Sequence, residues 1–269
     1  MAKIINDKYY TPQPIVDLVI QKTKKIIGLK NITEFIEPSA GNGAFLDKLY
    51  ETSIPTKAYD LYPERKDIIQ QDFLKLDLEY KKGRCIIGNP PYGKGNYLSV
   101  KFYKKSILQC DYIVYILPIS QLNNNMYMYE FDLIYSEDLR PQIYSGRKIH
   151  CCLNIYKRNK EGNNKKPNFD LEDLTLKGVA TGKSRNDKVP KSYDFSICGF
   201  GSSIGKFCDY EGQYCQQIYF TINNKKHYEA IVNILKNTNW KSLYNMVSTP
   251  KLNHWMINKY LKEQITGLK

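Results

Sequence analysis

The stretch Ile86–Gly95, IIGNPPYGKG, places Asn89, Pro90, Pro91 and Tyr92 directly after an apolar, strand-like run. Two adjacent prolines end a strand or a helix, because each lacks a backbone N–H donor and has a fixed φ. The turn therefore displays an amide and a phenol on a rigid backbone. What these two groups act on depends on the ligands that the rest of the sequence can bind.

A second set of polar residues lies at the predicted carboxyl ends of other strands. These residues are Glu37, Asp60 and Asp72. Gly41 and Gly43 permit a tight turn and a close approach of the backbone to a ligand. Asp60 follows Gly41 by 19 positions, where an acid accepts hydrogen bonds from ribose hydroxyls. The spacing predicts a nucleoside site, although a purely structural turn fits the glycines equally well. A dinucleotide fingerprint would need glycine in place of Leu46.

Short apolar runs alternate with helical patterns through the first half of the chain. Strands are predicted to end near Glu37 and to cover 56–63, 84–92 and 111–118, with helices after the glycine turn and over 98–109. This alternation predicts an α/β fold with a Rossmann-like, doubly wound and mostly parallel sheet. Two further strand-like runs flank Gly146 and Arg147 and predict an antiparallel hairpin at the end of the sheet. In such sheets ligands bind at the carboxyl ends of the strands, where the strand order reverses.

Length and composition indicate a globular protein. The 269 residues are 42% hydrophobic, which is enough for a sizeable core. The sequence has no apolar run of about 18 residues and no apolar segment at its start, so we expect a cytoplasmic protein without a membrane partner. Seven cysteines are scattered without a Cys-x-x-Cys pair, so we expect reduced thiols and no metal site.

The net charge of +13 comes from 40 basic and 27 acidic side chains. It predicts a polyanionic partner, although a lysine-rich solvated surface explains the charge equally well.

The polar stretch 157–170 is the best candidate for a linker. It divides a predicted catalytic domain, residues 1–159, from a small predicted recognition region, residues 160–269. The second region holds 17 basic and 10 acidic side chains. Within it, residues 176–191 are expected to form a loop that grips phosphate or enters a groove, unless the loop is only solvated. The residues expected to contact DNA there are Lys183, Arg185 and Lys188.

Five short motifs agree in order and spacing with one enzyme family. They are YYTP, EPSAGNGAF, YDLYP, QQDFLKL and NPPY. Together they resemble the S-adenosylmethionine-dependent amino-methyltransferases of DNA, specifically the adenine-N6 type. The order, with the cofactor motif before the catalytic motif and a recognition region at the C-terminus, is similar to the gamma arrangement of that family. The resemblance covers roughly residues 8–158.

The resemblance implies a cofactor role for each matched residue. Residues 37–43 would wrap the methionine part of S-adenosylmethionine, Asp60 would bind the ribose hydroxyls, and Asp72 with Phe73 would hold the adenine. Thr11 and Pro12 would close the site from the N-terminal side. Phe102 would pack on the cofactor base, although a plain core position is equally compatible with its spacing. The full implied set is Thr11, Pro12, Glu37, Pro38, Ala40, Gly41, Gly43, Asp60, Asp72, Phe73 and Phe102.

The resemblance also implies the chemistry of the NPPY turn. The exocyclic nitrogen of adenine is a poor nucleophile because its lone pair is delocalised into the ring. The Asn89 side-chain oxygen and the Pro90 carbonyl would accept its two N–H bonds and draw the nitrogen toward tetrahedral geometry. Tyr92 would stack on an adenine flipped out of the duplex. Pro91 and Tyr144 would contact the substrate, although in a chain with 23 tyrosines a packing role for Tyr144 is favoured.

Other functions stay open at this point. An Asn-Pro-Pro element also occurs in enzymes that methylate a glutamine of translation factors or a guanine of ribosomal RNA, but those families tend to carry an Asp-x-Gly glycine motif. EPSAGNG and YYTP favour adenine. Attack on carbon 5 of cytosine would need a Pro-Cys nucleophile, and the sequence contains no Pro-Cys dipeptide. A non-catalytic cofactor-binding or DNA-binding subunit is the remaining alternative. The expected partners are DNA and either a restriction endonuclease or a partner subunit.

Overall fold

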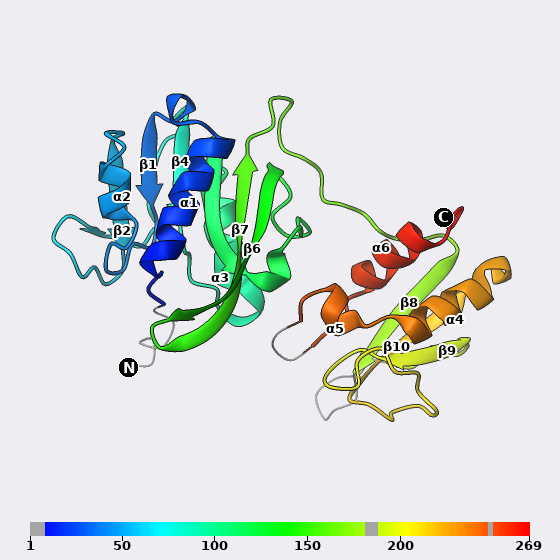
Figure 1. The fold of residues 1–269 in the computed structure, drawn as a ribbon. Coiled ribbons are helices and arrows are strands. Elements are labelled where there is room, and N and C mark those ends of the chain that lie inside the picture. The colour runs from blue at the N-terminus through cyan, green and yellow to red at the C-terminus, as the bar shows by residue number, and fades with distance from the viewer. Residues whose placement is uncertain (1–8, 181–187, 247–249) are drawn as a thin grey trace. The chain divides into compact units, whose positions relative to one another are not determined.

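The computed structural model describes residues 9–180, 188–246 and 250–269 (Figure 1). The chain forms two compact units, residues 1–167 and residues 168–269. Each unit has its own sheet and its own hydrophobic core.

The first unit is built on a seven-stranded sheet with the order β3-β2-β1-β4-β5-β7-β6. All neighbouring strands from β3 to β5 pair in parallel, and β7 is antiparallel to both β5 and β6. The predicted doubly wound sheet with a closing antiparallel hairpin is therefore confirmed. The strands are β1 (Glu34–Glu37), β2 (Thr56–Asp60), β3 (Ile69–Gln70), β4 (Arg84–Gly88), β5 (Tyr112–Pro118), β6 (Asp132–Tyr144) and β7 (Arg147–Lys157).

Helices cover both faces of this sheet, as Figure 1 shows. Successive residues of each strand point to opposite faces, so Phe35 packs toward one core cluster and Ile36 toward the other. The helices are α1 (Gln13–Ile26), α2 (Leu46–Tyr50) and α3 (Tyr97–Ser106), with short 3-10 turns η2 (Leu29–Asn31), η3 (Lys94–Asn96) and η4 (Ile119–Gln121).

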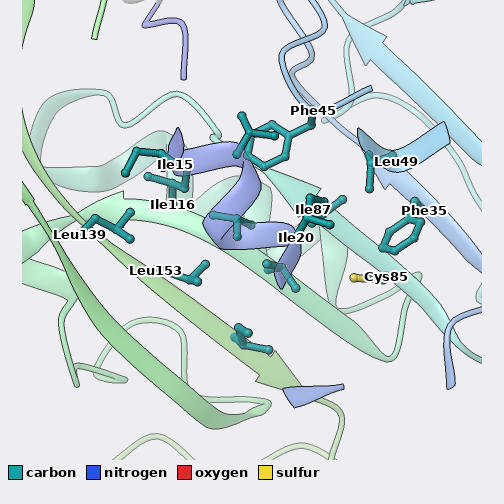
Figure 2. Close-up of a cluster of buried hydrophobic side chains, with 14 of the residues drawn as sticks. Ile15, Ile20, Phe35, Phe45, Leu49, Cys85, Ile87, Ile116, Leu139 and Leu153 are labelled. Carbon is teal, nitrogen blue, oxygen red and sulfur yellow. The ribbon is translucent and has the colours of Figure 1, made fainter. Parts of the chain in front are cut away.

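Helix α1 supplies much of the first core cluster. Its buried residues recur at helical spacing, and Figure 2 shows Ile15 and Ile20 of the helix in one cluster with Ile87 and Leu153 of the sheet. The helix begins after Pro12 and has a proline in its first turn. Proline is tolerated there because the backbone N–H that it lacks would have no partner within the helix. On the opposite face, α3 packs Phe102 and other apolar side chains into the second cluster.

The second unit has a three-stranded antiparallel sheet with the order β8-β10-β9. Apolar side chains of this sheet, including Ile218 and Phe220, pack against helices that supply Ile231 and Leu261. The elements are β8 (Leu174–Ala180), β9 (Phe195–Cys198), β10 (Gln216–Ile222), η5 (Lys225–His227), α4 (Tyr228–Asn237), α5 (Trp240–Leu243) and α6 (His254–Gln264). The prediction of a loop from residue 176 is wrong for residues 176–180, because this segment pairs with β10 as an edge strand.

The predicted linker begins on the first unit. Asn164 donates a backbone hydrogen bond to the Glu130 carbonyl at 2.8 Å and a side-chain bond to Asp132 at 2.8 Å. Residues 160–167 therefore belong to the first unit, whereas the sequence predicts the boundary between residues 159 and 160. The catalytic and recognition roles of the two units stay predictions.

We predict that residues 168–269 fold in isolation, because their sheet and helices close a core of their own. The fragment should give a dispersed amide NMR spectrum and a cooperative thermal transition. A control fragment that ends at residue 253 lacks α6 with the core residues Ile257 and Leu261, and it should be unfolded. A disordered spectrum for residues 168–269 would contradict the prediction.

Candidate active site

A cavity of about 280 Å³ lies at the carboxyl ends of the central strands of the first unit. Glu37 ends β1, Asp60 ends β2, and Asn89 follows β4 directly. The strand order reverses between β1 and β4, and this is the point at which doubly wound sheets bind ligands. The lining residues are Tyr9, Tyr10, Thr11, Glu37, Pro38, Ser39, Ala40, Gly41, Asn42, Ala44, Phe45, Asp60, Leu61, Tyr62, Gln71, Asp72, Phe73, Leu74, Asn89, Pro90, Pro91, Tyr92, Leu98 and Phe102.

The glycine turn after β1 is tied to the end of β2. Asp60 accepts hydrogen bonds from the backbone N–H of Gly41 at 2.8 Å and of Tyr62 at 2.7 Å. Gly41 and Gly43 have φ of 55° and 78°, a region that other residues seldom adopt. A Cβ at Gly43 would also lie 2.6 Å from the Arg65 side chain. The predicted tight turn is therefore real, and it brings the Asp60 carboxylate to the cavity wall.

Glu37 is a buried carboxyl group without a compensating partner. It is 2% exposed, and its Oε2 atom has no hydrogen-bond partner among the described residues. Burial raises its pKa well above the usual value, the nearby charge of Asp60 raises it further, and Arg65 only partly opposes this. A buried acceptor of this kind that faces a cavity fits a ligand that brings N–H donors or positive charge.

An apolar wall lies next to these acids. The rings of Phe73 and Phe102 stack with centroids 5.4 Å apart, and both line the cavity. Asp72 precedes Phe73 and accepts a hydrogen bond from the backbone N–H of Leu74 at 3.0 Å. The wall therefore combines a flat aromatic surface with a carboxylate at its edge, a combination that suits a planar heterocycle with an amino group.

The NPPY turn also lines the cavity. Asn89 Nδ2 donates to Thr11 Oγ1 at 3.3 Å, and Ser39 Oγ donates to the Asn89 backbone carbonyl at 3.3 Å. The Tyr92 hydroxyl lies 3.2 Å from Cys151 Sγ, and burial of this hydroxyl raises the pKa of the phenol. Both the amide and the ring are thus held in place at the cavity wall.

The first three residues of the N-terminal YYTP segment line the cavity next to this turn. Tyr10 donates its backbone N–H to Ser145 Oγ at 3.0 Å and its hydroxyl to Glu64 at 2.6 Å. Thr11 follows and is 8% exposed. Tyr9 and Tyr10 line the cavity but were not among the predicted site residues, although their adjacency to Thr11 was a usable signal.

Some predicted site residues lie elsewhere. Pro12 forms the N-cap of α1, and Gly43 donates its backbone N–H to the Ala40 carbonyl within the glycine turn; neither lines the cavity. Tyr144 is 1% exposed and belongs to the first core cluster, which agrees with the packing role. In the second unit Lys188 is exposed, whereas Lys183 and Arg185 lie outside the described residues.

Within the described parts of the chain, no group of three or more His, Cys, Asp or Glu side chains is placed to hold a metal ion. Nor is any helix in residues 9–180, 188–246 and 250–269 long and apolar enough to cross a membrane.

No protein-family model and no curated protein matches the sequence. Several solved structures resemble the fold. One is a candidate RNA methyltransferase from Pyrococcus horikoshii, with 10% identity and a TM-score of 0.48 over 59% of this chain and 90% of that one. Another is a candidate class I S-adenosylmethionine-dependent methyltransferase from Listeria monocytogenes, with 14% identity and a TM-score of 0.45 over 62% and 65%.

A third similar structure is the magnesium protoporphyrin IX methyltransferase from Synechocystis with bound S-adenosylmethionine, with 12% identity and a TM-score of 0.41 over 55% of this chain and 79% of that one. The fold rests on the strand order itself, which is that of a doubly wound, Rossmann-like sheet closed by an antiparallel hairpin.

We predict that two glutamates of the same strand affect stability with opposite pH dependence. Glu37→Gln should stabilise the protein at about pH 7, and the gain should shrink toward about pH 4, because the raised folded pKa of Glu37 makes stability fall as pH rises above the unfolded value of 4.5. Urea unfolding of the full chain over this pH range measures the effect.

The matched control is Glu34→Gln. Burial alone would raise the pKa of Glu34, but its ion pair with Arg84 at 2.6 Å and the charge of Lys81 outweigh burial and lower it. The stability from this pair is present above the unfolded pKa and is lost as pH falls, so Glu34→Gln should destabilise at about pH 7. The same pH dependence for both variants would contradict the assignment of Glu37 as an uncompensated acid.

Proposed function

We propose that the chain transfers a methyl group from S-adenosylmethionine to the exocyclic N6 of adenine in DNA. The observation that carries this proposal is the meeting of two polar groups in one cavity: the buried Glu37 carboxyl after β1 and the Asn89 amide after β4. One side of the cavity suits a cationic nucleoside, and the other presents hydrogen-bond acceptors to an amine.

The residues present fit the cofactor. The orphaned Glu37 oxygen suits the α-ammonium of its methionine part, and Asp60 is placed at the cavity wall for the ribose hydroxyls. Phe73 and Phe102 offer an apolar surface for the adenine ring, and Asp72 can accept a hydrogen bond from its amino group. The glycine turn leaves room for the methionine part beside the backbone.

When bound, the cofactor would supply a methyl group on a sulfonium sulfur. The sulfur would keep the electron pair of the broken carbon–sulfur bond, and the acceptor nitrogen would form the new bond to carbon and release a proton to water. The side chains and backbone of the protein act on the methyl acceptor, the amino group of adenine. Asn89 Oδ1 and the Pro90 carbonyl can each accept one N–H of the adenine amino group, which localises the lone pair on nitrogen. The two prolines hold both acceptors in place before the reaction, so this stabilisation requires little reorganisation.

Tyr92 supports binding of the same methyl acceptor, the adenine. Its ring lines the cavity, and its hydroxyl is held at Cys151, so the ring has a fixed orientation. An adenine inside a duplex cannot reach this pocket, and it must be extruded and stacked against such a wall.

The DNA partner is supported by charge. The chain carries 13 more basic than acidic side chains, and Lys188 of the second unit, which follows Lys183 and Arg185 in the sequence, is exposed. Basic side chains bind phosphates through the release of counterions, a term that does not depend on base sequence. We therefore assign residues 168–269 to DNA recognition within this proposal.

We predict that Asp60→Ala weakens S-adenosylmethionine binding by about 10- to 100-fold, on the order of 1.5–3 kcal/mol, because two hydrogen bonds to a charged acceptor are lost. Titration calorimetry measures the change. Asp77→Ala makes the same chemical change at an exposed position outside the cavity and should leave the affinity unaltered. Unchanged affinity in Asp60→Ala would remove Asp60 from the cofactor site.

We predict that Asn89→Ala keeps cofactor and DNA binding but transfers methyl groups at least about 100-fold more slowly, as expected when a transition-state hydrogen-bond acceptor is removed. The measurement is single-turnover transfer of labelled methyl to duplex DNA. RNA and a translation factor are assayed in parallel with the parent protein.

The assays with DNA, RNA and a translation factor as methyl acceptors separate the alternatives. Label in adenine of DNA supports the proposal, whereas label only in RNA or in glutamine would replace its substrate. Tight DNA binding without any transfer would favour a non-catalytic subunit. A folded Asn89→Ala with the rate of the parent would exclude the mechanism.

A further inference from the structure

Thr11 and Asn89 lie 78 residues apart in the sequence and meet at the cavity wall. Asn89 Nδ2 donates a hydrogen bond to Thr11 Oγ1 at 3.3 Å. Thr11 is 8% exposed, so little water competes for its hydroxyl. The amide that the proposed function makes catalytic is therefore in direct contact with a residue of the N-terminal segment.

We propose that Thr11 is a positioning residue, which orients the Asn89 amide so that Oδ1 rather than Nδ2 faces the methyl acceptor. This inference rests on the proposed function and assigns Thr11 a task distinct from closing the cofactor site. It concerns the orientation of one side chain at the acceptor side of the cavity.

The orientation matters because the two ends of an amide have similar size and opposite hydrogen-bond character. The oxygen accepts, whereas the nitrogen carries two donors. If Nδ2 faced the acceptor, its donors would oppose the N–H donors of the amine, and the nitrogen to be methylated would lose its activating contact. A hydrogen bond from Nδ2 to Thr11 favours the productive orientation.

Thr11 is itself held from both sides. Pro12 follows as the N-cap of α1, whose Ile15 and Val16 are buried in the first core cluster. Tyr10 precedes it and is anchored to Ser145 by its backbone N–H. The Thr11 hydroxyl is thus a fixed acceptor.

The Asn89 backbone is also fixed, which leaves the side-chain torsions as its remaining freedom. Ser39 holds its carbonyl, and Pro90 restricts its backbone conformation. Among the residues that the structure describes, the Asn89 side chain has a hydrogen bond only to Thr11. Removal of this bond should therefore change the orientation of the amide while the turn keeps its shape.

Thr11→Val tests the inference, because valine keeps the branched shape and lacks the hydroxyl. We expect single-turnover methyl transfer to fall about tenfold, with cofactor and DNA dissociation constants within about twofold of the parent. Thr11→Ala also lacks the hydroxyl but puts no methyl group in its place, and it should lose rate by the same factor. Thr11→Ser keeps the hydroxyl and should restore most of the rate.

A double-mutant cycle isolates the path through Asn89. In the Asn89→Ala background, Thr11→Val should cause no further loss of rate, because the side chain that it orients is absent. Losses that multiply in the double variant would overturn the inference, as would a parent-like rate in Thr11→Val or a cofactor affinity that falls by the same factor as the rate. A fully active Asn89→Ala would instead remove the proposed function, so the two failures are distinguishable.

Discussion

The parallel pairing of β1 with β4 determines where the polar groups of the site meet. Phe35 pairs with Cys85 and Ile36 with Ile86, so Glu37 lies beside the last residues of β4. A Cβ built on Gly88 would be 3.4 Å from the Glu37 side chain. One step further along each strand come the glycine turn and the NPPY turn. A shift of this register by one residue would exchange the two faces of the strand and separate the acid from the amide. The two groups of residues that the proposed function assigns to the cofactor and to the methyl acceptor are therefore brought together by one strand pair.

The pairing of β1 with β4 also buries a carboxyl group, which is electrostatically unfavourable. Glu34 and Glu37 are two buried acids of one short strand, but only Glu34 has an arginine partner. A carboxyl that is buried without a partner at a cavity is unfavourable for the unliganded protein and favourable for a ligand with positive charge. Stability and ligand affinity thus oppose each other at Glu37, which is common where a protein holds a preformed site.

Much of the first unit could be predicted from the sequence, because its strands are short apolar runs bounded by glycine, proline or acids. The same local signals placed Glu37, Asp60 and Asn89 at strand ends. The sheet of the second unit was missed: Lys177 lies in an edge strand whose polar residues resemble a loop, and β9 and β10 are separated by a long irregular segment. The contact of Thr11 with Asn89 and the burial of Tyr144 depend on tertiary packing, which no local pattern encodes.

The most direct test of the central claim is a crystal structure of the chain with duplex DNA and a non-reactive analogue of S-adenosylmethionine. The account predicts the ribose of the analogue at Asp60 and its base at the Phe73–Phe102 wall. It also predicts an extruded adenine with its amino nitrogen within hydrogen-bond distance, about 3 Å, of both Asn89 Oδ1 and the Pro90 carbonyl. An analogue bound outside this cavity, or an Asn89 amide whose nitrogen faces the extruded base, would contradict the account.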